Sequence, residues 1–206
     1  ESNGGLTIAE YATESTTVFG HSNAEGSNSI GAAFYGFTPP YGVEPASLIS
    51  FSSVGGNKVF YDKVGNRLPA PVTRLKPEVV GPNGANTTFF TQDLNFPPLG
   101  EPDGFPNFFG TSASAPHVAA IAALMLEAES SLSPADIREV LQSTALDMDN
   151  PYTSGFDEGF DFATGTGYVI AFEAVGSIFP KPYVASANLF GGDDATPLGE
   201  VEGTID

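Results

Sequence analysis

The sequence predicts an α/β domain in which a parallel sheet is flanked by helices. Two short apolar stretches with the length of buried strands lie at residues 29–35 and 76–84, ahead of a long apolar helix. A second helix is expected downstream, starting at Ser133. The order strand, strand, buried helix, helix is typical of half a parallel sheet with helices on its faces.

The longest apolar stretch is Val-Ala-Ala-Ile-Ala-Ala-Leu-Met-Leu at residues 118–126, which is apolar on every helical face and predicts a buried core helix. Small residues precede it, so we expect a loop that places Ser112 at the helix N-terminus. Free N–H groups and the helix dipole favour negative charge there. Ser112 can therefore hold a developing oxyanion near backbone donors, or it can be only the helix N-cap.

The amino-acid composition excludes some classes of binding partner. The 206 residues suffice for one domain with a core, and 25 acidic against 7 basic residues give a net charge of −18. Such a surface argues against nucleic acid as a partner and suits a saline or calcium-containing medium. No apolar run approaches the roughly 20 residues of a membrane span, so we expect no membrane partner. The absence of cysteine excludes disulfides and a cysteine nucleophile.

Three further segments have recognisable patterns. Residues 48–56 predict a strand and a turn, and residues 57–73 predict a hairpin. Residues 85–107 form a long loop rich in Phe, Asn and Pro, and loops of this length often have a function.

An acidic, Gly-rich loop follows the second helix. Its carboxylates are Asp147, Asp149, Asp157, Glu158 and Asp161. Hard oxygen ligands gathered in this way can bind calcium, but the spacing does not match an EF-hand, and solvated surface acids are the alternative. We therefore assign no metal ligands, expect no required cofactor, and keep calcium open.

The string Gly-Thr-Ser-Ala-Ser-Ala-Pro-His-Val-Ala at residues 110–119 closely resembles the nucleophile motif of the subtilisin-like serine proteases. Phe-Ser-Ser-Val-Gly at residues 51–55 and Lys-Pro-Glu-Val at residues 76–79 resemble other segments of that family, in the same order. The resemblance covers roughly residues 16–178, and it implies a last helix in the closing segment, residues 162–175. It implies a serine endopeptidase that acts through an acyl-enzyme, with Ser112 as the nucleophile. The residues that it implies as structural parts of the motif are Gly110, Thr111, Pro116 and His117.

The Asp and His of the family's catalytic triad have no counterpart in this sequence, because neither an Asp-Thr/Ser-Gly nor a His-Gly-Thr context occurs. The resemblance implies that His117 is not the base, and we expect His21 to be structural as well. Asn3 is the candidate for the family's oxyanion-binding Asn, with an ordinary Asn-Gly turn as the alternative. We therefore expect residues 1–180 to be the C-terminal half of a subtilisin-like peptidase domain, apparently without its N-terminal part and inactive alone.

The remaining expectations concern context. Residues 181–206 are predicted to be an acidic Gly/Pro-rich tail or linker. The resemblance implies peptide or protein substrates, and we expect a secreted or extracellular location. A sheet edge or an apolar face left exposed by the missing half would favour a homodimer. Two alternatives stay open: a non-catalytic subtilisin-like module with a binding or structural role, and an unrelated acidic secreted binding domain.

Overall fold

The computed structural model describes residues 16–89 and 92–179, together with the backbone of two short strands, β5 (Phe190–Gly191) and β6 (Thr196–Pro197). Asn3 and most of the expected tail lie outside the described residues. The interpretation of residues 181–206 as a tail or linker therefore stays a prediction.

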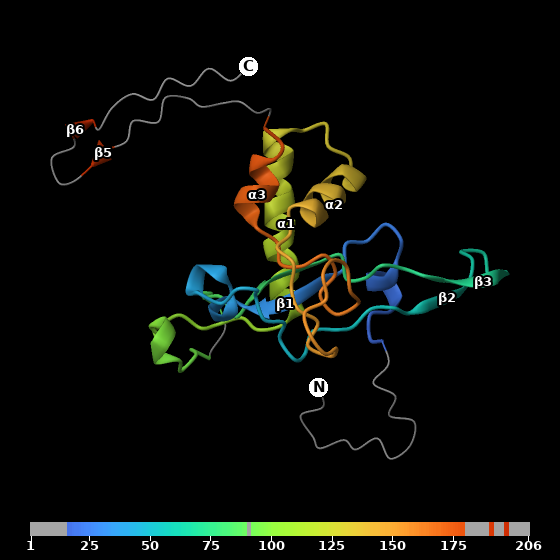
Figure 1. Ribbon diagram of the computed structural model, residues 1–206, viewed down its shortest axis with the longest axis horizontal. Helices are drawn as coiled ribbons and strands as arrows, with labels where there is room; N and C mark the ends of the chain where they lie inside the picture. Colours follow the sequence, from blue (N-terminus) through green and yellow to red (C-terminus); the bar gives the residue numbers. More distant parts are fainter. Residues whose placement is uncertain (1–15, 90–91, 180–189, 192–195, 198–206) are drawn as a thin grey trace, which may run out of the picture.

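A parallel pair of strands forms the centre of the fold (Figure 1). β1 (Ile30–Phe34) and β4 (Val79–Asn83) pair in register from Ile30 with Val79 to Phe34 with Asn83. Both strands are almost entirely buried, as parallel strands covered on both faces usually are. The structure thus confirms an α/β fold with a parallel sheet flanked by helices.

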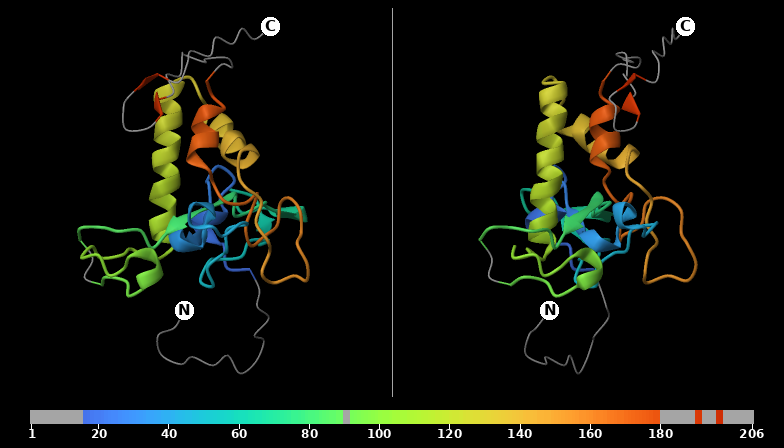
Figure 2. Two further views of the ribbon diagram at one scale, coloured as in Figure 1. Left: turned by 60° about the vertical axis from the view of Figure 1, so that its left-hand side comes forward. Right: turned by 90° about the vertical axis from the view of Figure 1, so that its left-hand side faces the viewer.

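α1 (Thr111–Ala128) packs on this sheet, and its buried side chains include Val118, Ile121 and Met125. α2 (Pro134–Ser143) and α3 (Ala171–Gly176) lie along the same side of α1 (Figure 2). These elements share one apolar core. Its buried members are Val79, Val118, Ile121, Met125, Ile137, Leu141, Val169 and Ala174.

The expectation that the long helix is buried on every face is wrong. Leu124 is 49% exposed and Leu126 39% exposed, and the alanines at 119, 120 and 123 also face solvent. Figure 2 shows α2 and α3 on the other side of α1, so neither helix covers these side chains. The apolar pattern of a helix shows which surface is suited to burial, but burial also requires a second element on that side.

The second helix follows its sequence signals closely. The Ser133 hydroxyl accepts a hydrogen bond from the Asp136 N–H at 3.2 Å, and the Asp136 carboxylate accepts one from the Ser133 N–H at 2.7 Å. This reciprocal capping box fixes the start of α2. Ile137 and Leu141 then face the core, as predicted.

The predicted hairpin is present, whereas the strand predicted just before it is not. β2 (Lys58–Tyr61) and β3 (Arg67–Thr73) pair in an antiparallel manner. Residues 48–56 make a single bridge, between Leu48 and Ala33, and otherwise run irregularly. Regular strand pairing is interrupted here because the Ala32 N–H donates to the side-chain oxygen Ser52 Oγ, at 3.1 Å, and not to a backbone carbonyl.

The edges of the parallel pair are largely occupied by other segments. The Ile49 N–H donates to the Ala32 carbonyl at 3.0 Å on the β1 side. On the β4 side, the Val80 N–H donates to the Gly167 carbonyl at 2.8 Å, and the Val169 N–H to the Val80 carbonyl at 2.9 Å. The sheet edge is therefore covered at these positions. The exposed surface is the alternative that we expected, an apolar face, and it lies on α1.

A buried ion pair joins the start of β4 to its surroundings. Lys76 Nζ contacts the Glu78 carboxylate and the Ser27 carbonyl, and both charged residues are almost fully buried. Glu78 also accepts the Ser29 N–H at 2.6 Å, and Arg138 Nε of α2 lies 3.8 Å from it. The pair therefore connects β4 with the segment before β1 and with α2.

Short 3₁₀ helices lie in the segments that connect the strands and helices. They are Gly20–Asn23, Tyr35–Phe37, Pro39–Tyr41 and Pro97–Leu99.

Within the described ranges, no helix combines the length and the apolar character that crossing a membrane would require.

Candidate active site

Ser112 lies in the first turn of α1 and is exposed. α1 begins at Thr111, well before the apolar run, so the predicted loop of small residues is in fact the first helical turns. Gly110 occupies the N-cap position with φ 128°, and no side chain caps the helix. The interpretation of Ser112 as the N-cap is therefore wrong.

Glycine is required at position 110 by this geometry. A positive φ of this size is rarely adopted by other residues, and a Cβ at Gly110 would lie 3.0 Å from Ser112 Oγ. A side chain here would thus crowd the candidate nucleophile.

The N-terminus of α1 presents backbone donors next to Ser112. The Ala113 and Ser114 N–H groups donate to the Gly110 carbonyl at 2.9 and 3.3 Å. The Thr111 and Ser112 N–H groups have no hydrogen-bond partner among the described residues, as expected for the first residues of a helix. The arrangement can stabilise an oxyanion that forms beside the serine.

No described histidine or carboxylate is hydrogen bonded to the Ser112 hydroxyl. His117 Nδ1 lies 2.8 Å from the Ala113 carbonyl, one turn earlier in α1, so this imidazole is engaged with its own helix. Pro116 lies within the same helix and is exposed. These positions agree with a structural role for His117 and leave Ser112 without a base in the described part of the chain.

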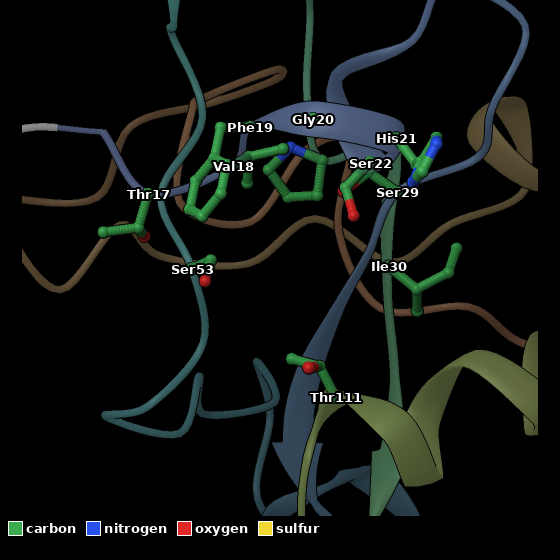
Figure 3. Close-up of a pocket in the computed structure, with 11 residues that line it drawn as sticks. Thr17, Val18, Phe19, Gly20, His21, Ser22, Ser29, Ile30, Ser53 and Thr111 are labelled. Atoms are coloured by element: carbon green, nitrogen blue, oxygen red, sulfur yellow. The ribbon is translucent and has the colours of Figure 1, made fainter. Parts of the chain in front are cut away.

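A pocket of about 400 Å³ opens beside the start of α1 (Figure 3). Thr111 forms one end of this pocket, whereas the ring of His21 lies at the opposite end, with Ile30 between them. His21 is exposed in the first 3₁₀ helix, and no hydrogen bond joins it to Ser112. The expectation that His21 is not the base stays a prediction, and this geometry is compatible with it.

Asn83 is a site residue that the sequence did not reveal. It ends β4, is fully buried, and its Oδ1 accepts a long hydrogen bond of 3.4 Å from the Gly110 N–H. Its Nδ2 is buried without a partner among the described residues. In the sequence, Asn83 belongs to a Pro-Asn-Gly string that only marks the end of the predicted strand. The hydrogen bond to Gly110 is what shows that Asn83 joins β4 to the start of α1.

An apolar hollow of about 380 Å³ lies on the side of Phe109, the residue before Gly110. Phe109 stacks on Phe34 of β1, with ring centroids 5.9 Å apart and planes 19° apart. Phe37, Leu48, Ile49 and Phe96 are among the other lining residues. The segment that leads into α1 therefore has an apolar recess beside it.

Residues 5–167 match the model of the subtilase family. This chain belongs to the subtilase family.

Relatives of this subtilase chain come from bacteria and plants. It is 34% identical to Bacillopeptidase F of Bacillus subtilis over 53% of its own length and 7% of the relative's. It is 32% identical to the subtilisin-like protease SBT5.1 of Arabidopsis thaliana over 61% of its own length and 17% of the relative's. The chain thus spans less than a fifth of these relatives.

Among solved structures, the chain is similar to fervidolysin from Fervidobacterium pennivorans, a keratinolytic enzyme related to subtilisin. The identity is 21% and the TM-score 0.48, with 82% of this chain and 21% of that chain covered.

In the acidic loop that we considered for calcium, the carboxylates accept hydrogen bonds from the backbone of the same loop. Asp147 accepts the Gly159 N–H at 2.8 Å, and Asp157 accepts the Asn150 N–H at 3.1 Å. Asp161 accepts the Ala163 N–H at 2.6 Å. Within the described ranges, the one group of carboxylates close enough to share an ion lies in another loop of this subtilase chain, at Asp93, Glu101 and Asp103.

Proposed function

We propose that this chain supplies the nucleophile segment of a serine endopeptidase, with Ser112 as the nucleophile. The observation that carries the proposal is the exposed hydroxyl of Ser112 in the first turn of α1, beside two backbone N–H groups without partners. Ser112 Oγ would attack the peptide carbonyl, and the resulting oxyanion would accept hydrogen bonds from these donors. Loss of the amine then leaves an acyl-enzyme, which water hydrolyses.

A serine hydroxyl is a weak nucleophile without an adjacent base. The described residues place none at Ser112, so we propose that the histidine and aspartate come from a further polypeptide segment. Without them, hydrolysis by this chain should be very slow, although oxyanion stabilisation can support some residual rate.

The uncovered face of α1 indicates where that segment would pack. Ser112, Ala115, Ala119 and Ala123 are spaced three and four residues apart, so they share one side of the helix. All four are exposed. A segment that covers this apolar stripe would therefore also reach the candidate nucleophile, which is the position a general base requires.

Peptide or protein substrates follow from this chemistry. The apolar hollow beside Phe109 is suited to an apolar side chain of such a substrate. The acidic composition suits a saline extracellular medium, and we propose a secreted location as the setting.

The second candidate function is a non-catalytic module that kept the subtilase scaffold. It is favoured by one observation, the lack of any described base at the Ser112 hydroxyl.

Fluorophosphonate labelling, located by peptide mass spectrometry, separates the two functions. The 206-residue chain is treated alone and after mixing with a polypeptide that carries the N-terminal half of a subtilase domain. Ser112→Ala is the negative control, and Ser114→Ala is the matched control, because Ser114 is in the same helix but fully buried.

Labelling at Ser112 only in the mixture supports the proposal, and Ser114→Ala should not reduce it. Complete labelling of the chain alone would show that a base is already present, and would contradict the need for a second segment. Absence of labelling in a mixture that forms a complex would favour the non-catalytic module.

A further inference from the structure

Three carboxylates converge in the long loop that leads to α1. Asp93 precedes the 3₁₀ helix Pro97–Leu99, whereas Glu101 and Asp103 follow it. Each contributes an oxygen atom, and the three oxygens lie within 4.8 Å of one another. Like charges at this separation repel one another, so the arrangement calls for a compensating positive charge.

Two of these carboxylates hold oxygens that are buried and lack a partner. Glu101 is only 4% exposed, and its Oε1 accepts hydrogen bonds from the Tyr35 hydroxyl at 2.8 Å and from Asn107 Nδ2 at 3.2 Å. Its Oε2 has no partner, and neither has the buried Oδ1 of Asp93. A buried oxygen without a hydrogen-bond partner destabilises the folded state, so each of these two atoms requires an explanation.

No cation of the described residues compensates this negative charge. Among the described residues, the carboxylates of Asp93, Glu101 and Asp103 form no ion pair with any lysine, arginine or histidine. The chain as a whole has only 7 lysine and arginine residues. An ion from solution would supply the positive charge that the described residues lack.

We propose that Asp93, Glu101 and Asp103 form a calcium site. Calcium binds carboxylate oxygens at about 2.3–2.6 Å, so two oxygens on one ion can be up to roughly 5 Å apart. The observed spread of the three oxygens fits within that limit. Magnesium requires strict octahedral geometry at about 2.0–2.1 Å and usually keeps several of its waters, so a site made of three protein carboxylates suits it less well.

The carboxylates are held in place by the surrounding backbone and side chains. The second oxygen of Asp93 accepts the Gly104 N–H at 2.7 Å, and Asp103 accepts Asn86 Nδ2 at 2.6 Å. These bonds fix the ligands before an ion arrives, as second-layer contacts do in metal sites.

An open hollow gives an ion access to the carboxylates. Its volume is about 430 Å³, and Glu101 and Asp103 both line it. Tyrosines surround the same hollow, at positions 35, 41 and 168. An entry path of this kind is one of the conditions that a metal site must meet.

The site is connected to the residues just before the candidate nucleophile. Asn107 bonds to Glu101 and also donates to the Gly84 carbonyl at 3.0 Å, at the end of β4. Its Oδ1 accepts the Leu94 N–H at 2.6 Å. A bound ion would therefore order the segment that enters α1, although the ion site itself does not depend on the proposed catalysis.

Terbium luminescence of the full 206-residue chain tests the site. Tb³⁺ replaces Ca²⁺ and emits when a nearby aromatic residue is excited, and this chain has no tryptophan. We expect emission that saturates at one ion per chain, with Tyr35, bonded to Glu101, as the sensitiser. Calcium should displace the terbium, and magnesium should do so poorly. Physiological ionic strength suppresses weak binding at the acidic surface.

Variants locate the bound ion. Asp93→Asn and Glu101→Gln should each weaken calcium binding about ten-fold or more. Tyr35→Phe should lower the emission per bound terbium while calcium binding by calorimetry persists. Asp149→Asn is the matched control: it removes one charge from the other acidic loop, where Asp149 is exposed, and should leave calcium affinity within about two-fold.

Several results would overturn the assignment. They are calcium affinity unchanged in both Asp93→Asn and Glu101→Gln, a loss of binding in Asp149→Asn, or no saturable calcium binding at all. If circular dichroism shows that the variants do not fold, limited proteolysis of the parent chain decides. Calcium should then protect residues 85–107 from cleavage, and equal cleavage with and without calcium would refute the site.

Discussion

Replacing Glu78 by glutamine tests how the start of β4 is held. Lys76 is 2% exposed and Glu78 4% exposed, so the ion pair lies inside the protein. Among the described residues, Glu78 is the only carboxylate paired with Lys76. The variant keeps the volume of the side chain but leaves a buried lysine charge without a counter-charge.

The structure sets the expected magnitude. Removing one partner of a buried pair costs about 3–5 kcal/mol of unfolding free energy, because the remaining charge stays desolvated. Arg138→Ala is the matched comparison: Arg138 Nε lies 3.8 Å from Glu78, and its side chain is 28% exposed. A partly solvated contact of this kind should contribute at most about 1 kcal/mol.

Urea unfolding followed by circular dichroism measures both effects. With a slope of about 2–3 kcal/mol per molar urea, the midpoint of Glu78→Gln should fall by roughly 1–2.5 M. The double variant Lys76→Met, Glu78→Gln should recover much of this loss, because it buries no charge. The reasoning is refuted if Glu78→Gln costs less than Arg138→Ala, or if the double variant is less stable than Glu78→Gln alone.

Three further predictions concern the scaffold and one tyrosine. Gly165→Ala should destabilise the chain by about 2 kcal/mol or more in urea unfolding, because φ is 68° and a Cβ would lie 2.5 Å from the carbonyl oxygen that precedes β4. Gly155→Ala is the control: φ is 82°, but no atom lies within 4 Å of the added Cβ, so it should cost only about 1 kcal/mol. Equal losses of stability in the two variants would contradict this account. Met125→Ala should cost about 2–5 kcal/mol because Met125 is fully buried, and a smaller loss would mean that the core collapses around the gap. Burial, followed by the hydrogen bond to Glu101, raises the pKa of Tyr35 above its ordinary value of 10.0. The stability that this group contributes is therefore fully present below about pH 10 and is lost progressively as the pH rises from there through the higher pKa of the folded state. In an ultraviolet titration, Tyr35→Phe should remove one tyrosine that ionises late, and an unchanged number of late-ionising tyrosines would refute the assignment.

The sequence alone determined the features that depend on neighbouring residues. The Ser-Pro-Ala-Asp start of α2 contains its own capping box, and the short apolar stretch before Phe34 forms β1 as predicted. The string around Ser112 was sufficient to indicate the family, which the match over residues 5–167 confirms. These signals are local, so they survive without knowledge of the path of the chain.

Tertiary structure alone decided which distant groups meet. Asn83 and Gly110 are far apart in sequence and become partners because β4 ends where α1 begins. The three carboxylates of the loop before α1 converge because the chain turns back at Pro97–Leu99, and no spacing rule predicts that turn. The exposed side of α1 has the same origin. Burial is a property of two surfaces, and the sequence of one helix describes only one of them.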